Sequence, residues 1–337
     1  MQTPLSQPKD SDLSAANWHL LTRFWHPVAF MTEIADKPYP FVLLGLRLIA
    51  YRTTAGFTVA LDRCPHRGTS FALGFLKDDR LVCGYHGLQY DGTGRCVAVP
   101  SSGPEAKVPP SLCLRVFRSE ARYGLLWVLL AEEPMLPLPA WTPLEDPGLQ
   151  KVKMTPVDWA CSAARHVENF NDVAHFSWIH AGTFGNRDDP LTPRYQLRNT
   201  DAGIYREIKV RQIDRDTFSD KPETVAEMDY AYNFVFPFAS YLRIASADGR
   251  VEHIFDVVRP ISARRSRVFI LKARNYDLGQ PVDEWIRFQE AVNAEDQAMV
   301  ESQEPQDLPL DLTLESHIAA DAWSIAYRRR WKSLGLE

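Results

Sequence analysis

Two short segments, each with one cysteine and one histidine, constrain this chain more than any other feature. Cys64 precedes His66 by two positions and Cys83 precedes His86 by three, with sixteen residues (67–82) between the two pairs. Two thiolates and two neutral imidazoles suit a [2Fe–2S] cluster whose cysteines bind one iron and whose histidines bind the other. A glycine beside each pair suits a tight loop that approaches the sulfides closely. The four residues therefore predict an iron–sulfur cluster.

Zinc is the alternative occupant of such a set of residues. Structural zinc sites usually combine a Cys-x₂-Cys pair with a histidine pair or a second cysteine pair, and Cys-x-His followed by Cys-x-x-His fits that pattern poorly. The spacing resembles the Rieske signature. Rieske proteins of respiratory complexes add two cysteines that form a disulfide beside the cluster, whereas Thr69, or a near neighbour, and Tyr85 stand at the matching positions here. This difference favours the oxygenase and ferredoxin branch.

Length, composition and charge exclude several classes of protein. The 337 residues are enough for two domains, 45% are hydrophobic and 24% charged, and the net charge of −5 argues against a nucleic-acid partner. Residues 1–17 contain no apolar signal segment, and the longest apolar run, residues 123–131, is too short to cross a bilayer. We expect Cys96, Cys113 and Cys161 to be ordinary buried thiols. These features predict a cytoplasmic protein without a membrane partner.

Changes in composition divide the chain into three segments. Residues 18–133 contain short β-type runs, residues 134–147 form a proline-rich linker, and residues 148–337 form a second domain. Strands of the first domain are expected at 41–51, 57–61, 81–83, 112–117 and 123–130, and strand-like stretches of the second run from about 205 to 271. Helices are expected at 163–179, 282–303 and 319–334. The last contains Arg328–Arg330, which we expect on a solvated face that complements the helix dipole.

A second candidate metal site lies within the helical segment 163–179 and just after it. Asp172 is followed by His175 and then by His180, so the segment offers two imidazoles and a carboxylate. On a regular helix Asp172 and His175 share a face, and His180 lies well off it. Both imidazoles can face one metal only if the helix ends or distorts between them, and we predict that it does. Alone, the two histidines also fit an ordinary core position; the upstream cluster favours a mononuclear non-haem Fe(II) site.

The carboxylate ligand of that site must come from elsewhere in the chain. On the predicted helix 282–303, Asp296 falls in register with an apolar stripe formed by Trp285, Phe288, Val292 and Met299. A carboxylate inside an apolar stripe is costly unless it is paired or bound to a metal. The neighbouring Glu295 is rotated towards the polar face, where an acid needs no special explanation. We therefore assign the third ligand to Asp296, with a solvated helix acid as the alternative.

With both motifs in this order, the chain resembles the Rieske non-haem iron oxygenases along nearly its whole length. It is most similar to the single-subunit, phthalate-dioxygenase-like type, which includes methylxanthine N-demethylases and dicamba O-demethylase. The resemblance implies an α+β fold: an antiparallel β Rieske domain, then a helix-grip (START-like) catalytic domain with an antiparallel sheet. It also implies a homotrimer in which the cluster of one subunit faces the iron of the next. Asp172 would then accept hydrogen bonds from His175 and, across the interface, from cluster ligand His86.

The resemblance also implies a reaction. A terminal oxygenase of this type uses O₂ and two electrons to monooxygenate a small aromatic or heterocyclic substrate, and we expect oxidative N- or O-demethylation that releases formaldehyde. The chain has no flavin or nicotinamide fingerprint, so NAD(P)H acts only through a separate reductase, with or without a ferredoxin. Pocket walls are expected at about 228–244 and 251–258. Most of the aromatic residues there are expected to belong to the core.

The sequence is compatible with three alternatives. Within the same family, the enzyme would hydroxylate a ring or alkyl C–H bond, or dihydroxylate a ring. A Rieske electron carrier would explain the cluster residues but leave Asp172, His175, His180 and Asp296 without a role. A zinc-bound interaction module would be colourless, whereas Rieske clusters are red-brown.

Overall fold

The computed structural model describes residues 5–105, 107–214 and 224–337. They form two compact units, one ending at Pro137 and one beginning at Leu138, and this division lies within the proline-rich segment 134–147. Residues 1–4 of the predicted polar N-terminal segment and residues 215–223 of the predicted strand region lie outside the described residues. In the part of the chain that is described, no helix is both long enough and apolar enough to cross a membrane.

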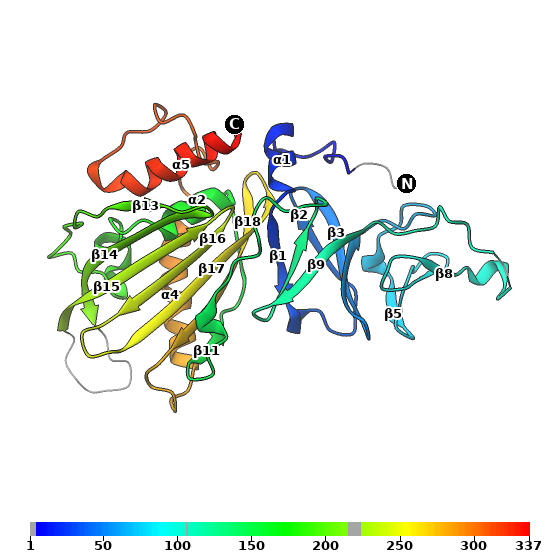
Figure 1. Cartoon of the computed structure of the whole chain (residues 1–337), viewed down its shortest axis with the longest axis horizontal. Coiled ribbons are helices and arrows are strands. Elements are labelled where there is room, and N and C mark those ends of the chain that lie inside the picture. Colours follow the sequence, from blue (N-terminus) through cyan, green and yellow to red (C-terminus); the bar gives the residue numbers. More distant parts are fainter. Residues whose placement is uncertain (1–4, 106, 215–223) are drawn as a thin grey trace. The chain divides into compact units, whose positions relative to one another are not determined.

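The first unit contains two antiparallel sheets (Figure 1). A short helix, α1 (Ala15–Leu21), precedes them. The six-stranded sheet has the order β1 (Trp25–Phe30), β10 (Leu125–Leu129), β9 (Val116–Arg122), β4 (Gly56–Leu61), β3 (Leu46–Thr53), β2 (Tyr39–Leu43). The smaller sheet has the order β5 (Phe75–Lys77), β6 (Arg80–Val82), β7 (Gln89–Tyr90), β8 (Cys96–Ala98). Cys64 and His66 lie on the connection from β4 of the larger sheet to β5 of the smaller one, and Cys83 and His86 lie on the loop between β6 and β7.

Turns shorten three of the strands predicted for this unit. The stretch 41–51 is two strands, because Leu44 and Gly45 both have positive φ and form a tight turn between β2 and β3. Tyr123 and Gly124 also have positive φ and connect β9 to β10, so the last strand begins at Leu125. Of residues 112–117, only the last two belong to β9. Each predicted stretch contains a strand, but most of the predicted ends differ from the observed ones, and β1, β5, β7 and β8 were not predicted.

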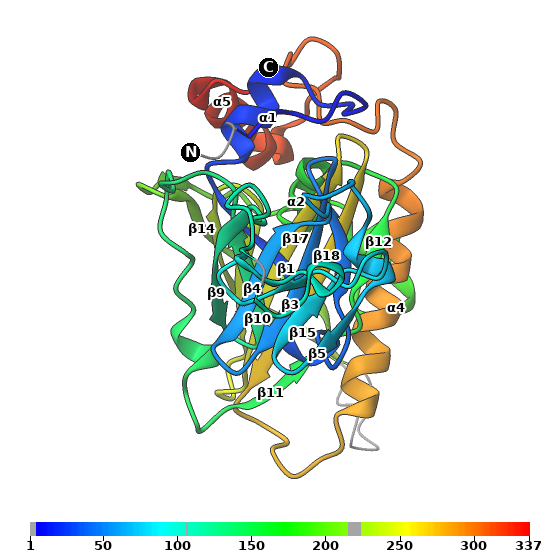
Figure 2. The ribbon, with the colours of Figure 1, turned by 90° about the vertical axis from the view of Figure 1, so that its right-hand side faces the viewer.

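The second unit wraps one antiparallel sheet around a long helix. The sheet has the order β11 (Gln150–Lys153), β18 (Arg265–Arg274), β17 (Val251–Ser262), β16 (Ala239–Ala245), β15 (Thr224–Val235), β14 (Gly203–Asp214), β13 (Leu197–Asn199), and β12 (Val157–Trp159) also pairs with β18. Helix α4 (Asp283–Val300) lies along one face of this sheet (Figures 1 and 2). The predicted α+β class with antiparallel sheets is confirmed.

The predicted helix 163–179 is not continuous. It consists of α2 (Ala163–Phe170) and the single turn α3 (Phe176–Ile179). Asn171 ends α2 because its side-chain amide donates to the backbone oxygen of Val167 and to Ser240 Oγ. Asp172 then accepts the backbone N–H of His175 at 3.0 Å. Side chains of Asn and Asp that bind the backbone in this way compete with regular helix, which explains the break.

The cysteines outside the cluster motifs differ in their exposure. All five cysteines of the chain are free thiols. Cys96 and Cys161 are buried as predicted, whereas Cys113 is exposed, so the prediction of three buried thiols is wrong at this position. Cys113 forms an isolated β-bridge with Arg95, and its neighbour Leu114 takes the buried position instead. The alternation of an extended backbone accounts for the difference.

Helix α5 (Ala322–Leu334) covers an aromatic end of the sheet. Trp323, Tyr327 and Trp331 lie on one face and contact Phe234 and Phe236, with ring centroids between 4.9 and 6.1 Å apart. The prediction that Arg328–Arg330 form a solvated face is wrong for Arg328, which is 3% exposed. Its guanidinium donates to both carboxylate oxygens of Glu168 at 2.7 Å, and it also pairs with Glu315 at 2.6 Å. Arg328 therefore joins α5 to α2.

We expect Arg328→Ala to lower the free energy of unfolding by about 3 kcal/mol, because it leaves the carboxylate of Glu168 without its bidentate partner in a largely buried position. Urea titration followed by circular dichroism measures the change. Arg329→Ala, at an exposed position of the same helix, is the control. A midpoint for Arg328→Ala that equals that of the control would contradict a structural role for this ion pair.

Candidate functional site

The four residues of the first motif lie on two loops with the same hydrogen-bond pattern. In the first, Cys64 N–H donates to the oxygen of Thr69 and Gly68 N–H donates to the oxygen of Cys64, both at 2.8 Å. In the second, Cys83 N–H donates to Leu88 and Gly87 N–H donates to Cys83, both at 2.9 Å. Gly68 and Gly87 have φ of 76° and 70°, which residues with a side chain adopt only at a cost. Each loop thus presents its cysteine and histidine in the same way.

In both loops the cysteine side chain is buried and the histidine side chain is exposed. Cys64 and Cys83 are 2% and 1% exposed, whereas His66 and His86 are exposed and their ring centroids are 4.7 Å apart. The Tyr90 hydroxyl lies 3.4 Å from Cys64 Sγ. Burial, together with the nearby Cys64 thiol, raises the pKa of Cys83, so a cationic group is needed to hold both thiolates there. These residues fit a [2Fe–2S] cluster with buried sulfur ligands and solvent-facing imidazole ligands.

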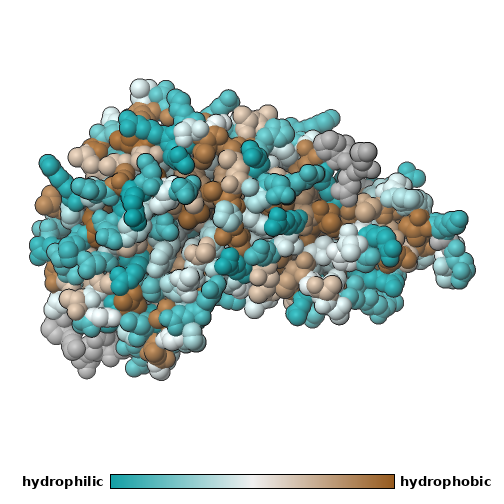
Figure 3. Space-filling model, viewed as in Figure 1, coloured by the Kyte–Doolittle hydropathy of each residue, from teal (hydrophilic) through white to brown (hydrophobic). Residues whose placement is uncertain are grey.

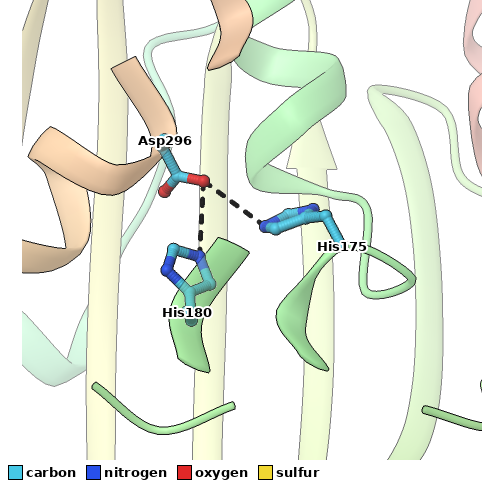
Figure 4. A group of neighbouring side chains, drawn as sticks. All are labelled: His175, His180 and Asp296. Carbon is cyan, nitrogen blue, oxygen red and sulfur yellow. Dashed lines mark ion pairs between the residues drawn. The ribbon is translucent and has the colours of Figure 1, made fainter. Parts of the chain in front are cut away.

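The second motif forms a compact group of two histidines and one carboxylate (Figure 4). His175 precedes α3, His180 follows it, and Asp296 lies on α4. Asp296 Oδ1 lies 3.4 Å from His175 Nε2 and 3.3 Å from His180 Nε2. One ligand atom from each residue lies within 4.8 Å of the others. The structure therefore brings together the three residues predicted to bind the mononuclear iron.

The local backbone confirms the predicted distortion between the two histidines. The α-helical turn α3 ends at Ile179, and His180 begins a 3₁₀ turn (His180–Gly182). The tighter winding rotates the His180 ring towards His175, and the two ring centroids are 5.1 Å apart. A regular helix would have turned His180 away from the group.

Two further carboxylates orient the imidazoles. His175 Nδ1 donates to Asp172 Oδ2 and His180 Nδ1 donates to Glu295 Oε2, both at 2.8 Å. With each Nδ1 protonated, both Nε2 atoms keep a lone pair directed at Asp296, whose buried Oδ1 has no hydrogen-bond partner among the described residues. Metal-binding histidines typically donate their second ring N–H to a carboxylate in this way. The group fits a divalent metal such as Fe(II), for which two imidazoles and one carboxylate are a typical set of protein ligands.

Neighbouring side chains shift the pKa values of the two aspartates and of His180. Burial raises the pKa of Asp296, but the two imidazoles and the side-chain amide of Asn169 outweigh this effect and hold the pKa below its usual value. Burial likewise raises the pKa of Asp172, and its hydrogen bonds from His175 lower it further than burial raises it. Burial lowers the pKa of His180, and Asp296 and Glu295 together raise it above its usual value. Both aspartates therefore remain anionic at neutral pH.

Glu295 is the residue that sequence reasoning missed. It was placed on the polar face of its helix, and that interpretation is wrong. Besides His180, it accepts a hydrogen bond from Thr183 Oγ1 at 2.8 Å. A Cβ on Gly182 would lie 2.9 Å from Glu295 Oε1, so this position favours glycine. The adjacent pair Glu295 and Asp296 thus contacts His180 through both of its ring nitrogens.

We expect Glu295→Leu to weaken metal binding by the His175, His180 and Asp296 group about 10- to 100-fold, since loss of the carboxylate frees the His180 ring to rotate. Fe(II) titration of metal-depleted protein under anaerobic conditions measures the affinity. Glu295→Gln, whose amide oxygen still accepts the Nδ1 proton, should recover most of it. Equal affinities in Glu295→Leu and in Glu290→Leu, an exposed position on the same helix, would contradict this role.

The metal-binding group opens into a cavity of about 200 Å³ between the sheet and α4. Side chains alternate along a strand, and every second residue of β15, β17 and β18 faces the cavity: Met228, Tyr230, Tyr232, Glu252, Ile254, Asp256, Ile270, Lys272 and Arg274. The expectation that most aromatic residues of the late sheet are core holds for Phe234, Phe236 and Phe238, which pack on α5. Tyr230 and Tyr232 line the cavity instead.

The apolar stripe predicted for α4 faces this cavity rather than a closed core. Trp285, Phe288 and Val292 line the cavity together with Asp296. Met299 does not belong to the stripe, because it is 53% exposed near the end of the helix. The predicted apolar stripe therefore placed Asp296 correctly on the cavity side of α4, although Met299, its last residue, is exposed.

Comparison with known proteins identifies both units. Residues 24–117 match the family model described as "Rieske [2Fe-2S] domain". Residues 159–337 match the model described as "Vanillate O-demethylase oxygenase C-terminal domain", and this match alone spans more than half of the chain. The two matches contain the two motifs described above, in the same order.

Some similar proteins match nearly the whole chain, and others match about half of it. Methylxanthine N1-demethylase from Pseudomonas putida is 31% identical over 93% of this chain and 89% of its own length. The solved structure of the Pseudomonas putida CBB5 protein NdmA with caffeine superposes with a TM-score of 0.82 at 29% identity, covering 94% of this chain and 91% of that one. The vanillate O-demethylase oxygenase subunit of Pseudomonas sp. strain HR199 is 30% identical over 50% of this chain and 48% of its own length.

Proposed function

The chain belongs to the Rieske non-haem iron oxygenases, and from this premise we propose that it catalyses oxidative N- or O-demethylation of a small aromatic or heterocyclic substrate. The observation that carries the proposal is the placement of His175, His180 and Asp296 in the wall of a cavity whose lining includes several aromatic side chains, among them Phe170, Tyr230 and Trp285. The similarity to N- and O-demethylating relatives favours a methyl group as the carbon that is oxidised.

In this proposal the residues of the two motifs hold two separate iron centres. Cys64, His66, Cys83 and His86 would hold the [2Fe–2S] cluster, and His175, His180 and Asp296 would hold the mononuclear Fe(II). When bound, the two centres would supply monooxygenation chemistry: two electrons, passed singly through the cluster, and two protons reduce one atom of O₂ to water while the other is added to a substrate C–H bond. Asp172 and Glu295 keep the imidazoles oriented, and the cavity wall positions the methyl group and excludes water. A hydroxylated N- or O-methyl group then breaks down to formaldehyde and the demethylated product.

Electrons come from a separate reductase, because the relatives include oxygenase subunits of multicomponent systems. We propose that this reductase uses NAD(P)H, directly or through a ferredoxin.

We also propose a homotrimer in which the cluster loops of one subunit face the iron site of the next. Hydrophilic side chains cover most of the surface visible in Figure 3, and hydrophobic ones gather in small groups. Three exposed hydrophobic side chains lie in or near the cluster loops: Leu73, Phe75 and Tyr85. Another, Trp178, follows His175 by three residues and is 58% exposed. Surfaces of this kind support contact with a partner subunit.

The test is a product screen with the reconstituted protein, a surrogate reductase, NADH and O₂. The panel contains N-methyl, O-methyl and unmethylated heteroaromatic compounds, and mass spectrometry follows the products. Loss of a methyl group with an equal amount of formaldehyde supports the proposal. Gain of one oxygen atom without formaldehyde would make the enzyme a hydroxylase, and gain of two would make it a dioxygenase. Reductase without the oxygenase is the control.

A further inference from the structure

A buried arginine interrupts the apolar face of strand β14. The buried side chains that alternate along this strand are those of Ile204, Arg206, Ile208 and Val210. Arg206 is only 1% exposed, so its guanidinium has lost nearly all of its hydration. Burial of a charged group is costly unless neighbouring groups compensate for the lost hydration. The surroundings of Arg206 must therefore supply that compensation.

Two tyrosine rings enclose the guanidinium. The guanidinium carbon of Arg206 lies 4.7 Å from the ring centroid of Tyr195 and 4.4 Å from that of Tyr232. Tyr232 stands opposite Arg206 in the antiparallel pairing of β14 with β15. Tyr195 is held just before α5, where its hydroxyl donates to the backbone oxygen of Ala320 at 2.7 Å. Because a desolvated guanidinium is attracted to aromatic faces, the two rings restrict its position.

The guanidinium donates to the peptide group that joins Asn171 to Asp172. Nη2 of Arg206 donates a hydrogen bond to the backbone oxygen of Asn171. At the other end of this peptide group, the N–H of Asp172 donates to the backbone oxygen of Asn169 at 3.0 Å. A hydrogen bond from a charged donor is roughly twice as strong as one between neutral groups. Both polar atoms of the peptide group are therefore held.

The orientation of this peptide group determines where the Asp172 carboxylate lies. The group stands in the break between α2 and α3, where the helical hydrogen bonding is interrupted. Asp172 has a short side chain, so a rotation of its backbone would move the carboxylate away from His175 Nδ1, which now lies 2.8 Å from it. Burial raises the pKa of Tyr232, the charge of Arg206 lowers it and the charge of Asp172 raises it, so both charges lie close to the same hydroxyl.

We propose that Arg206 is a positioning residue for electron transfer, because by holding the carbonyl of Asn171 it keeps the Asp172 carboxylate in place between the two iron centres. The inference rests on the proposed trimer, in which Asp172 contacts His175 and, across the interface, His86. Arg206 acts through Asp172 and contributes no metal ligand. The two rings also explain why this position is an arginine: a planar guanidinium presents a face to each ring while it donates in its own plane, which a lysine ammonium does not.

The test is a double-mutant cycle between Arg206 and Asp172 in the reconstituted holoenzyme at saturating Fe(II). The reduced protein is mixed with O₂ and substrate, and reoxidation of the cluster is followed by stopped-flow absorbance. Arg206→Met should slow reoxidation at least about tenfold, and Arg206→Lys, which keeps one charged donor, should slow it by a smaller factor. Because Arg206 acts through Asp172, Arg206→Met should cause no further slowing in a protein that already contains Asp172→Ala.

The reduction potential of the cluster, titrated without O₂, is the second readout. Loss of the Asp172 carboxylate beside His86 should raise this potential, and its displacement in Arg206→Met should raise it in part. Removal of the positive charge of Arg206 would by itself lower the potential, so the sign of the shift separates the two effects. Ile208→Ala is the matched control, since it removes buried atoms from the same face of β14 without changing a charge. It should destabilise the protein and leave reoxidation and potential at their wild-type values.

Wild-type reoxidation in every folded Arg206 variant would overturn the inference. So would a slowing by Arg206→Met that multiplies with that of Asp172→Ala, or a potential that does not rise in Arg206→Met. If Asp172→Ala itself is reoxidised at the wild-type rate, the bridge of the proposed trimer fails and the inference fails with it. A slow Asp172→Ala protein beside a wild-type Arg206→Met protein would refute the role of Arg206 alone.

Discussion

Replacing Asp296 with alanine should leave a red-brown protein with about two irons per chain instead of about three, and its product formation should fall more than about 100-fold. The two remaining irons are those of the cluster, whose proposed ligands lie in the first unit. Asp296 lies between the two Nε2 atoms, at 3.4 Å from His175 and 3.3 Å from His180. Without it the two imidazoles retain neither the negative charge nor the third ligand that Fe(II) requires.

Iron analysis, the visible spectrum of the cluster and the formaldehyde assay measure the three parts of this result. Glu284→Ala provides the control, because Glu284 is an exposed acid on the same helix and pairs with Arg287 at 3.7 Å. That control should retain about three irons and full turnover. An Asp296→Ala protein that still binds the third iron with wild-type affinity would show that another residue supplies the carboxylate.

Local patterns explain why the sequence was sufficient to predict most of the candidate site. The cluster residues lie on two loops whose hydrogen bonds span only a few residues, so their spacing already encodes the geometry. His175 and His180 are separated by one short turn, and the need for a distorted helix followed from that spacing. Asp296 was identified by its position in the apolar stripe of α4, although the histidines that it meets are far away in the chain.

Long-range contacts determine the positions of the polar residues that the sequence did not identify as buried. Glu295 lies one residue from the predicted ligand, but its partner His180 is 115 residues away. Arg328 was expected at the surface because the sequence of helix α5 alone does not indicate its partner Glu168, which lies 160 residues earlier. His166 and Asp256 are 90 residues apart and belong to no motif. In each case a polar residue is buried because tertiary structure supplies its partner, which periodicity does not reveal.

The second large effect concerns Asp172, whose side chain is 24% exposed, compared with 13% for that of His175. At saturating Fe(II), we expect Asp172→Ala to retain the cluster spectrum and about three irons per chain, while product formation falls at least about 100-fold. Asp172 Oδ2 accepts both the backbone N–H and the Nδ1 proton of His175, at 3.0 and 2.8 Å. In the proposed trimer its other oxygen accepts a hydrogen bond from His86 of the neighbouring subunit. His86 is exposed and therefore available for that contact.

A single-turnover experiment separates this bridging role from simple support of His175. The cluster is reduced, the protein is mixed with O₂ and substrate, and reoxidation of the cluster is followed by stopped-flow absorbance. Loss of a bridge between the two centres should slow reoxidation in Asp172→Ala, whereas Asp188→Ala, at an exposed acid of the same unit, should behave as wild type. Glu295→Leu provides the contrast, because it should lose iron without slowing electron transfer in the molecules that keep it. If Asp172→Ala loses iron as Glu295→Leu does and transfers electrons normally when reloaded, Asp172 only orients His175, and the subunits do not communicate through it.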